Sequence, residues 1–158
     1  MDDAGDSSTS ALRGAVPGSR GAPGAVGRSP AVTLRDLMTT RVAGTTRDAT
    51  VAAAAGAMVG ANAGSAVVMQ GAFLVGIITE RDVLKAAAAE ADLSAATVAD
   101  WMTPDPQSAT PETPVEEAAQ IMLLNGFRHL PVVDGRAVCG VVSLRDLFAA
   151  RIRRPAPS

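Results

Sequence analysis

Two short segments of this sequence place a hydroxyl and a carboxylate at the same spacing after a glycine. The pattern Gly-x-x-(Thr/Ser)-x-x-Asp occurs at residues 76–82, with Thr79 and Asp82, and again at residues 140–146, with Ser143 and Asp146. Each hydroxyl stands where an apolar run ends and a helical pattern begins. It can cap that helix, whose unpaired N–H groups favour an anion such as phosphate. The carboxylate can accept both hydroxyls of a ribose, so the segment supplies the contacts that a nucleotide needs.

The same spacing also has a purely structural interpretation. A hydroxyl followed three residues later by an acid is a variant of the capping box. Asp82 and Asp146 would then only complement the helix dipole, which is worth about 0.3–1 kcal/mol for each carboxylate. Two copies at equivalent positions favour ligand binding without removing the structural alternative.

The elements that must position these groups come from an internal repeat. A shift of 64 residues aligns residues 32–84 with residues 96–148 without a gap, and 14 of the 53 aligned positions are identical. Aligned Gly, Asp and Met positions cannot be explained by the alanine-rich composition. We therefore expect one structural unit to occur twice, with each copy too small to bury its apolar faces alone.

Each copy reads as helix, strand, strand, helix. Helices are predicted over residues 51–61, 80–89, 115–124 and 144–152, and short lead-in helices over 33–38 and 97–102. Strands are predicted over 66–69, 73–78, 130–133 and 137–142, with extended stretches near 42–46 and 106–110. At the start of the helix after Pro114, Thr113 is expected to cap and Glu116 to complete a capping box.

Composition limits the organisation of the rest of the chain. Residues 1–30 have almost no large apolar side chains, so we expect a disordered tail there. The expected order continues with repeat one at 31–90, a linker at 91–95, repeat two at 96–152 and a disordered C-terminus at 153–158.

Charge and rare residues exclude several classes of function. The formal net charge of −2 gives no general attraction to nucleic acid or to an anionic membrane. One histidine, His129, and one cysteine, Cys139, make a multi-histidine or thiolate metal site unlikely. The sequence also lacks a long apolar span and a signal-peptide pattern, so the expected location is the cytoplasm.

Both repeats resemble cystathionine-β-synthase (CBS) domains, and the pair resembles a Bateman module. The resemblance covers residues 32–150 and rests on the openings at 36–39 and 100–103, on residues 128–134 and on the two Gly-x-x-(Thr/Ser)-x-x-Asp ends. It implies an α+β (α/β-like) fold of two β-α-β-β-α repeats packed sheet to sheet about a pseudo-twofold axis. It also implies a homodimer and an adenosine-type ligand, which would be AMP, ADP, ATP or S-adenosylmethionine, in clefts between the repeats.

Carried over by position, the resemblance makes Asp82 and Asp146 the ribose ligands and gives Thr79 and Ser143 hydroxyl contacts near the ribose and phosphate. Each cleft would also take residues from the other repeat. Those expected for the Asp146 cleft lie within 39–46 and just after the first long helix, namely Thr39, Thr46 and Ala63.

Arg128 and His129 are expected near a phosphate in the Asp146 cleft, because repeat one has Gly64 and Ser65 at their positions. A phosphorylated ligand is therefore expected there. The Asp82 cleft would use Thr103, Ala109 and Phe127, where Phe127 either forms a wall for the purine or fills the site. Arg81 and Arg145 would reach a phosphate or stay solvated at their helix ends.

Three functions compete on this sequence. The first is a regulatory sensor of adenine nucleotides that acts on a separate, unidentified target protein. The second is a ligand-free interaction and dimerisation module whose clefts are filled by its own side chains. The third is an enzyme, which ranks last because no nucleophile–base set or phosphate-binding glycine loop is visible.

Overall fold

A computed structural model describes residues 30–153 of the chain. The expected disordered tails, at 1–30 and 153–158, lie outside the described residues except for Pro30 and Arg153. Arg153 ends the last helix.

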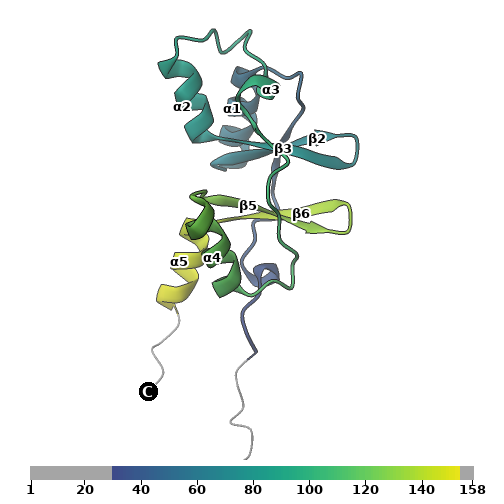
Figure 1. Cartoon of the computed structure of the whole chain (residues 1–158), viewed down its shortest axis with the longest axis vertical. Coiled ribbons are helices and arrows are strands. Elements are labelled where there is room, and N and C mark those ends of the chain that lie inside the picture. Colours follow the sequence, from purple (N-terminus) through teal and green to yellow (C-terminus); the bar gives the residue numbers. More distant parts are fainter. Residues whose placement is uncertain (1–29, 154–158) are drawn as a thin grey trace, which may run out of the picture.

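The first seven elements of the described chain run from Leu34 to Trp101 (Figure 1). A 3-10 turn, η1 (Leu34–Asp36), precedes strand β1 (Ala43–Thr45) and helix α1 (Val51–Ala61). The hairpin of β2 (Ser65–Gln70) and β3 (Phe73–Thr79) leads into α2 (Glu80–Ala88), and the short helix α3 (Val98–Trp101) follows. These positions confirm the helices and strands that the apolar periodicity predicts, to within one or two residues.

The second half, whose lead-in is α3, repeats this order of a long helix, a hairpin and a closing helix. Strand β4 (Thr103–Pro104) precedes α4 (Val115–Asn125), the hairpin of β5 (His129–Asp134) and β6 (Ala137–Ser143), and α5 (Leu144–Arg153). The expected cap of α4 is wrong. The helix starts from Pro114, which has no side-chain donor or acceptor, and Thr113 Oγ1 accepts the Thr110 N–H at 3.1 Å instead.

Each half of the molecule completes the sheet of the other. Strand β4, from the start of repeat two, pairs with β3, and Thr103 faces Ile77 in that register. The equivalent residue of repeat one, Thr39, pairs in the same antiparallel way with Val141 of β6. On the other edge, Thr45 pairs with Val68 and Ala109 pairs with Val132, both in parallel. The two sheets therefore have matching edges.

The two hydrophobic cores follow this exchange. Val98 and Met102, from the second lead-in, pack with α1, β2 and β3 in the first core. Leu34, from the first lead-in, is fully buried in the second core with Met122 and Leu130. Because each lead-in buries its apolar side chains in the opposite half, neither repeat contains its own complete core.

Two glycines make this exchange geometrically possible. A Cβ on Gly76 would lie 2.6 Å from the Met102 sulfur, and a Cβ on Gly140 would lie 2.8 Å from the Met38 sulfur. These separations are shorter than real van der Waals contacts. The glycine of each Gly-x-x-(Thr/Ser)-x-x-Asp motif thus leaves room for a methionine from the other repeat's lead-in.

The halves are stacked with their hairpins pointing the same way and their sheets facing each other, as Figure 1 shows. Helices α1 and α2 cover one sheet, and α4 and α5 cover the other. The expected α+β fold of two β-α-β-β-α repeats, packed sheet to sheet about a pseudo-twofold axis, is confirmed.

Candidate functional site

The hydroxyl and carboxylate of the first motif form a reciprocal cap at the start of α2. Asp82 Oδ2 accepts the Thr79 backbone N–H at 2.8 Å and the Thr79 hydroxyl at 2.9 Å. The Asp82 backbone N–H donates back to Thr79 Oγ1 at 3.4 Å. This is the capping box that the structural interpretation predicts.

The second motif forms the same cap at the start of α5. Asp146 Oδ2 accepts the Ser143 backbone N–H at 3.1 Å and the Ser143 hydroxyl at 2.6 Å. In both caps only one carboxylate oxygen is used, and within residues 30–153 no hydrogen bond reaches Oδ1 of Asp82 or of Asp146. Capping and ligand binding are therefore compatible, because the second oxygen stays available as an acceptor.

A pocket of about 460 Å³ lies in front of Asp82 and is built by both halves. Repeat one supplies residues at the end of β3 and along α2, which are Ile77, Thr79, Glu80, Arg81, Asp82 and Lys85. The rest of the chain supplies Thr103, Asp105, Pro106, Gln107, Asn125, Gly126, Phe127, Arg128 and His129. A ligand in this pocket would touch both repeats at once.

Three cations in this pocket have no acidic partner. They are Arg81 and Lys85 on α2 and Arg128 from the other half. The one salt bridge among residues 30–153 joins Arg35 to Glu112, far along the chain from all three. Two further acids, Glu80 and Asp105, also line the pocket, so its overall charge is balanced while single cations remain available to an anionic group.

His129 lies half-buried at the boundary between the halves. Burial lowers the pKa of its imidazole below the ordinary value of 6.5, the nearby carboxylates of Glu80 and Asp146 act in the opposite direction, and Arg128 adds to the lowering. The ring is therefore mostly neutral at pH 7, and an anion bound beside it would favour the charged form.

Arg128 and His129 line the pocket of Asp82, which corrects the expectation that they serve the Asp146 cleft. Helix α4 ends at Asn125, and residues 126–129 that follow it all line the Asp82 pocket. Arg128 and His129 therefore share this pocket with Phe127. Phe127 and Thr103 line the Asp82 pocket, as the resemblance implies.

Ala109 lies in the second core rather than in the pocket. It is only 8% exposed, it packs with Leu130 and Val132, and its backbone N–H donates to the Pro131 carbonyl at 2.9 Å. The residue holds the edge of the second sheet in place. Ala109 follows the second lead-in, as expected, but its side chain packs in the second core and does not line the Asp82 pocket.

Around Asp146 the surroundings differ. Asp146 lines a cavity of about 490 Å³ between α4, α5 and the segment that carries Asp36 and Leu37. The other residues expected with it are spread out: Thr39 bonds to β6 through its backbone, Thr46 is exposed, and Ala63 packs against the first core. Arg145 and its equivalent Arg81 are both exposed, but only Arg81 lines the Asp82 pocket.

Sequence reasoning missed several residues of the Asp82 pocket. Lys85 lies three positions after Asp82, so helical spacing places both on one face of α2 and could have identified it. Asp105 and Gln107 lie close after Thr103 in the sequence. The expectation that Thr103 lines the Asp82 cleft could therefore have been extended to them. Asn125, at the end of α4, offered no comparable signal.

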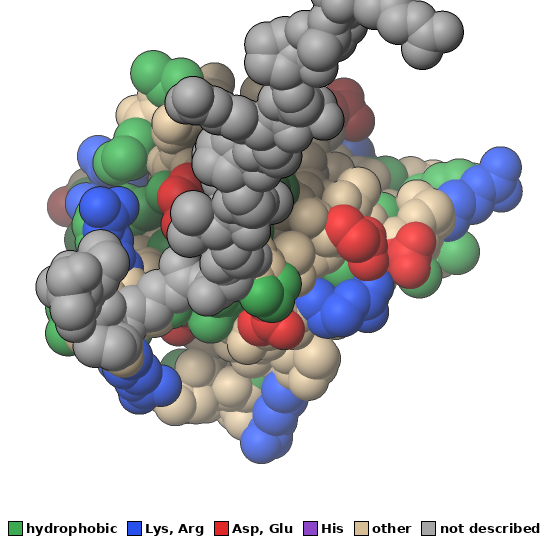
Figure 2. Space-filling view, turned by 90° about the horizontal axis from the view of Figure 1, so that it is seen from below, with side chains coloured by type: hydrophobic (Ala, Val, Ile, Leu, Met, Phe, Trp, Pro, Cys, Tyr) green, Lys and Arg blue, Asp and Glu red, His purple; other side chains and the backbone are tan. Residues whose placement is uncertain are grey.

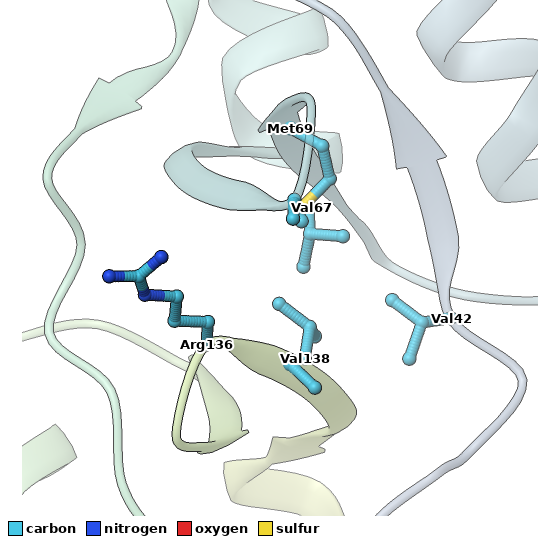
Figure 3. A pocket seen from close by; sticks show the side chains of 7 residues that line it. Val42, Val67, Met69, Arg136 and Val138 are labelled. Atoms are coloured by element: carbon cyan, nitrogen blue, oxygen red, sulfur yellow. The ribbon is translucent and has the colours of Figure 1, made fainter.

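A separate cavity of about 430 Å³ opens between the two hairpins (Figure 3). Its lining is apolar apart from one arginine and consists of Val42, Val67, Met69, Ala72, Arg136, Ala137 and Val138. Arg136 lies over the Phe73 ring at 5.4 Å from its centroid, a cation–π contact between the two halves. None of the expected site residues reaches this cavity.

The described part of the chain offers neither a metal cluster nor a membrane-crossing helix. Residues 30–153 contain no group of three or more His, Cys, Asp or Glu side chains that could hold a metal ion. No helix in that range is long and apolar enough to cross a membrane.

Comparison with known proteins places these features in a family. The sequence profile of the CBS domain matches the chain twice, at residues 34–89 and 98–153. An uncharacterized 17.7 kDa protein of Acidianus ambivalens is 42% identical over 122 residues, which are 76% of this chain and 73% of that protein.

Solved structures agree with the sequence match. The CBS domain pair of protein MJ0100, in complex with 5′-methylthioadenosine and S-adenosyl-L-methionine, is 27% identical with a TM-score of 0.70, and the match covers 77% of this chain and 99% of that one. A hexameric CBS-CP12 protein from bloom-forming cyanobacteria is 26% identical with a TM-score of 0.74, over 82% of this chain and 79% of that one.

Proposed function

Because this chain belongs to the CBS-domain family and carries the domain as a tandem pair, we propose that it is a regulatory module that binds an adenosine-type ligand in the pocket of Asp82. The ligand would be AMP, ADP, ATP or S-adenosylmethionine. The single observation that carries this proposal is that Oδ1 of Asp82 accepts no hydrogen bond within residues 30–153. The cap holds this carboxylate in place, and it lies in a pocket built by both halves.

The chemistry of the pocket matches the parts of such a ligand. Asp82 Oδ1 can accept ribose hydroxyls, and Ile77 and Phe127 offer apolar surface to a purine. Arg81, Lys85 and Arg128 can donate charge-assisted hydrogen bonds to a phosphate or a carboxylate. The related MJ0100 pair, which binds adenosyl compounds, supports this ligand class.

Signalling would follow from the two-sided construction of the pocket. A ligand that contacts α2 of one half and residues 125–129 of the other stabilises one relative angle of the halves over others. The population of that angle changes the outer surface, which a separate target protein can read. This mechanism needs no catalytic step, and we place the protein in the cytoplasm as part of the same proposal.

Calorimetry with the purified chain tests the proposal directly. Titration with AMP, ATP and S-adenosylmethionine should give a saturable heat for at least one of them. Asp82→Asn should weaken that binding strongly, because the amide can keep the cap through its oxygen but presents an NH₂ group where Oδ1 accepted the ribose.

Asp100→Asn is the matched control. Asp100 Oδ2 accepts the Thr97 hydroxyl at 2.9 Å in the same three-residue spacing, but the pair lies outside the pocket. This variant should bind like the unchanged protein. Absence of heat with all three ligands at millimolar concentration would contradict the proposed function.

A second candidate function, self-association without a ligand, is favoured by a different observation. Large apolar side chains are exposed on the helices at repeat-equivalent positions, Val59 with Leu123 and Leu84 with Phe148. The same face left uncovered in both halves suits a symmetric dimer. Light scattering would show a monomer for Leu84→Gln combined with Phe148→Gln if these faces form the dimer, and an unchanged mass if they do not.

Charge argues against nucleic acid as the partner. On the face shown in Figure 2, Lys and Arg side chains are interspersed with Asp and Glu rather than gathered. The part of that face left uncovered in Figure 2 shows no stripe of unbalanced positive charge, which binding to a phosphate backbone requires.

A further inference from the structure

One residue, His129, adjoins both motifs, and the equivalent position of the other repeat is a serine. His129 opens β5, and its register partner across the hairpin is Ser143. The Ser143 hydroxyl donates to Asp146 at 2.6 Å. The backbone of His129 thus adjoins the cap of the second motif.

The imidazole of His129 reaches in the opposite direction, across the boundary between the halves. Its Nε2 lies 3.0 Å from the point where a Cβ on Gly64 would stand, and the Glu80 carboxyl carbon lies 3.4 Å from that same point. The ring also lines the pocket of Asp82. His129 therefore belongs to the surroundings of both motifs.

The repeat makes this arrangement one-sided. The residue equivalent to His129 is Ser65, which pairs in the same register with Thr79 but is only 4% exposed and too short to cross to the other half. Any direct link between the two motifs through this position runs through His129 alone.

We infer that His129 couples the occupancy of the two motif sites, so that an anionic ligand bound beside one carboxylate increases the affinity of the other site. This inference rests on the proposed function, since it concerns the same class of ligand. The physical link is one proton taken from solvent by the imidazole, because an anion at either site stabilises the imidazolium form.

The charged groups that face the ring set the sign of the coupling. Glu80 on α2 and Asp146 on α5 favour the imidazolium, while Arg128 and burial oppose it. In the free protein above about pH 7 the ring is mostly neutral, so the first ligand must supply the free energy of protonation. The second ligand then meets a ring that is already charged and binds more tightly.

Calorimetric titration with AMP at two pH values tests the coupling. At pH 8 we expect AMP bound at one site to raise the affinity of the other site about 10-fold, with proton uptake visible as a difference in heat between Tris and HEPES buffers. At a second pH well below the lowered pKa of His129, where the ring is protonated before any ligand binds, the two sites should be independent and the ring should take up no proton.

Three variants separate this role from simple ligand contact. His129→Gln should remove both the coupling and the proton uptake at pH 8. Arg128→Gln should weaken the binding of AMP at both pH values and keep the proton uptake. Gly64→Ala, which places a Cβ against Nε2, should reduce the coupling without touching a motif residue. Far-ultraviolet circular dichroism checks that each variant is folded.

The outcomes distinguish this inference from the proposed function. If no adenosine-type ligand binds, the proposed function fails and the coupling fails with it. If AMP binds at one site only, binds at two independent sites, or binds at pH 8 without proton uptake by the unchanged protein, the coupling is wrong and the proposed function stands.

Discussion

The two motif sites share their local geometry and differ in what surrounds them. In both halves the Asp Oδ2 accepts a backbone N–H and a hydroxyl three residues earlier. Only the Asp82 pocket also contains Arg128 and His129, since the equivalent residues on the other side are Gly64 and Ser65. Lys85 of that pocket corresponds to Ala149. A motif that folds identically twice can therefore face two pockets with different cations, which are Arg81, Lys85 and Arg128 in one and Arg151 and Arg153 in the other.

This difference shows that residues from the opposite repeat, more than the motif itself, decide what each site can bind. The motif fixes an acceptor at the start of a helix through bonds between neighbours in sequence. The cations that would hold a phosphate come partly from residues 128 and 129, across the boundary between the halves. Divergence at those positions changes the ligand without disturbing the fold.

The largest expected effect separates the two carboxylates. Asp82→Asn should weaken the tight binding of a phosphorylated adenosine ligand about 100-fold, since hydrogen bonds to a charged group are worth about 1.5–3 kcal/mol. Asp146→Asn should leave that tight site in place and change only a second, weaker one. Calorimetric stoichiometry and affinity measure both; equal losses in the two variants would show that the halves are functionally alike.

A substitution in each motif glycine compares the two exchanged lead-ins. Gly140→Ala forces a Cβ against the Cβ, Cγ and sulfur of Met38 and should reduce the free energy of unfolding by about 1–3 kcal/mol. Gly76→Ala should cost less if the Met102 sulfur, at the flexible end of its side chain, can move away. Chemical denaturation measures both values.

Met38→Ala should partly restore the stability of Gly140→Ala, because it removes the atoms that the new Cβ would meet. The same Met38→Ala change in the unsubstituted protein should destabilise it. If the double variant loses the sum of the two single effects, the close contact between Gly140 and Met38 is not the cause of the loss.

Removing one cation that lines the Asp82 pocket and one that does not tests the contribution of pocket charge. Arg128→Met should weaken the binding of a phosphorylated ligand about 10-fold, equivalent to about 1.4 kcal/mol. It should also reduce the dependence of that affinity on salt concentration. Arg145→Met, at an exposed position outside the Asp82 pocket, should leave the affinity unchanged. A similar loss in both variants would indicate general attraction rather than contact in one pocket.

The smallest expected effect is on stability against pH. Burial gives His129 a pKa below 6.5 in the folded chain, so between that lowered value and about 6.5 the unfolded chain binds more protons. The stability that comes from the neutral ring is thus present above about pH 6.5 and is lost as pH falls towards the lowered pKa. Thermal unfolding from pH 7.5 to 5 should show a smaller decline for His129→Gln; an identical decline would assign the pH dependence to other groups.

The sequence alone determined the parts of this protein that depend on neighbours along the chain. Apolar periodicity located α1, the two hairpins and α5, and the spacing of Thr79 to Asp82 and of Ser143 to Asp146 predicted both caps. The repeat and the family resemblance supplied the sheet-to-sheet pairing. Prediction failed at the start of α4, where Thr113 bonds to Thr110 instead of the helix, because two local hydrogen-bond partners compete for one hydroxyl.

Only the tertiary structure decided which half each shared residue serves. The repeat permits Arg128 and His129 to lie beside either carboxylate, and it permits Ala109 to face the pocket or the core; packing of the two halves placed the first two with Asp82 and buried the third. Hydrogen bonds within three or four residues are encoded by the residues that make them. Contacts between repeats depend on the angle at which two apolar sheets close, a property that no short segment of this sequence contains.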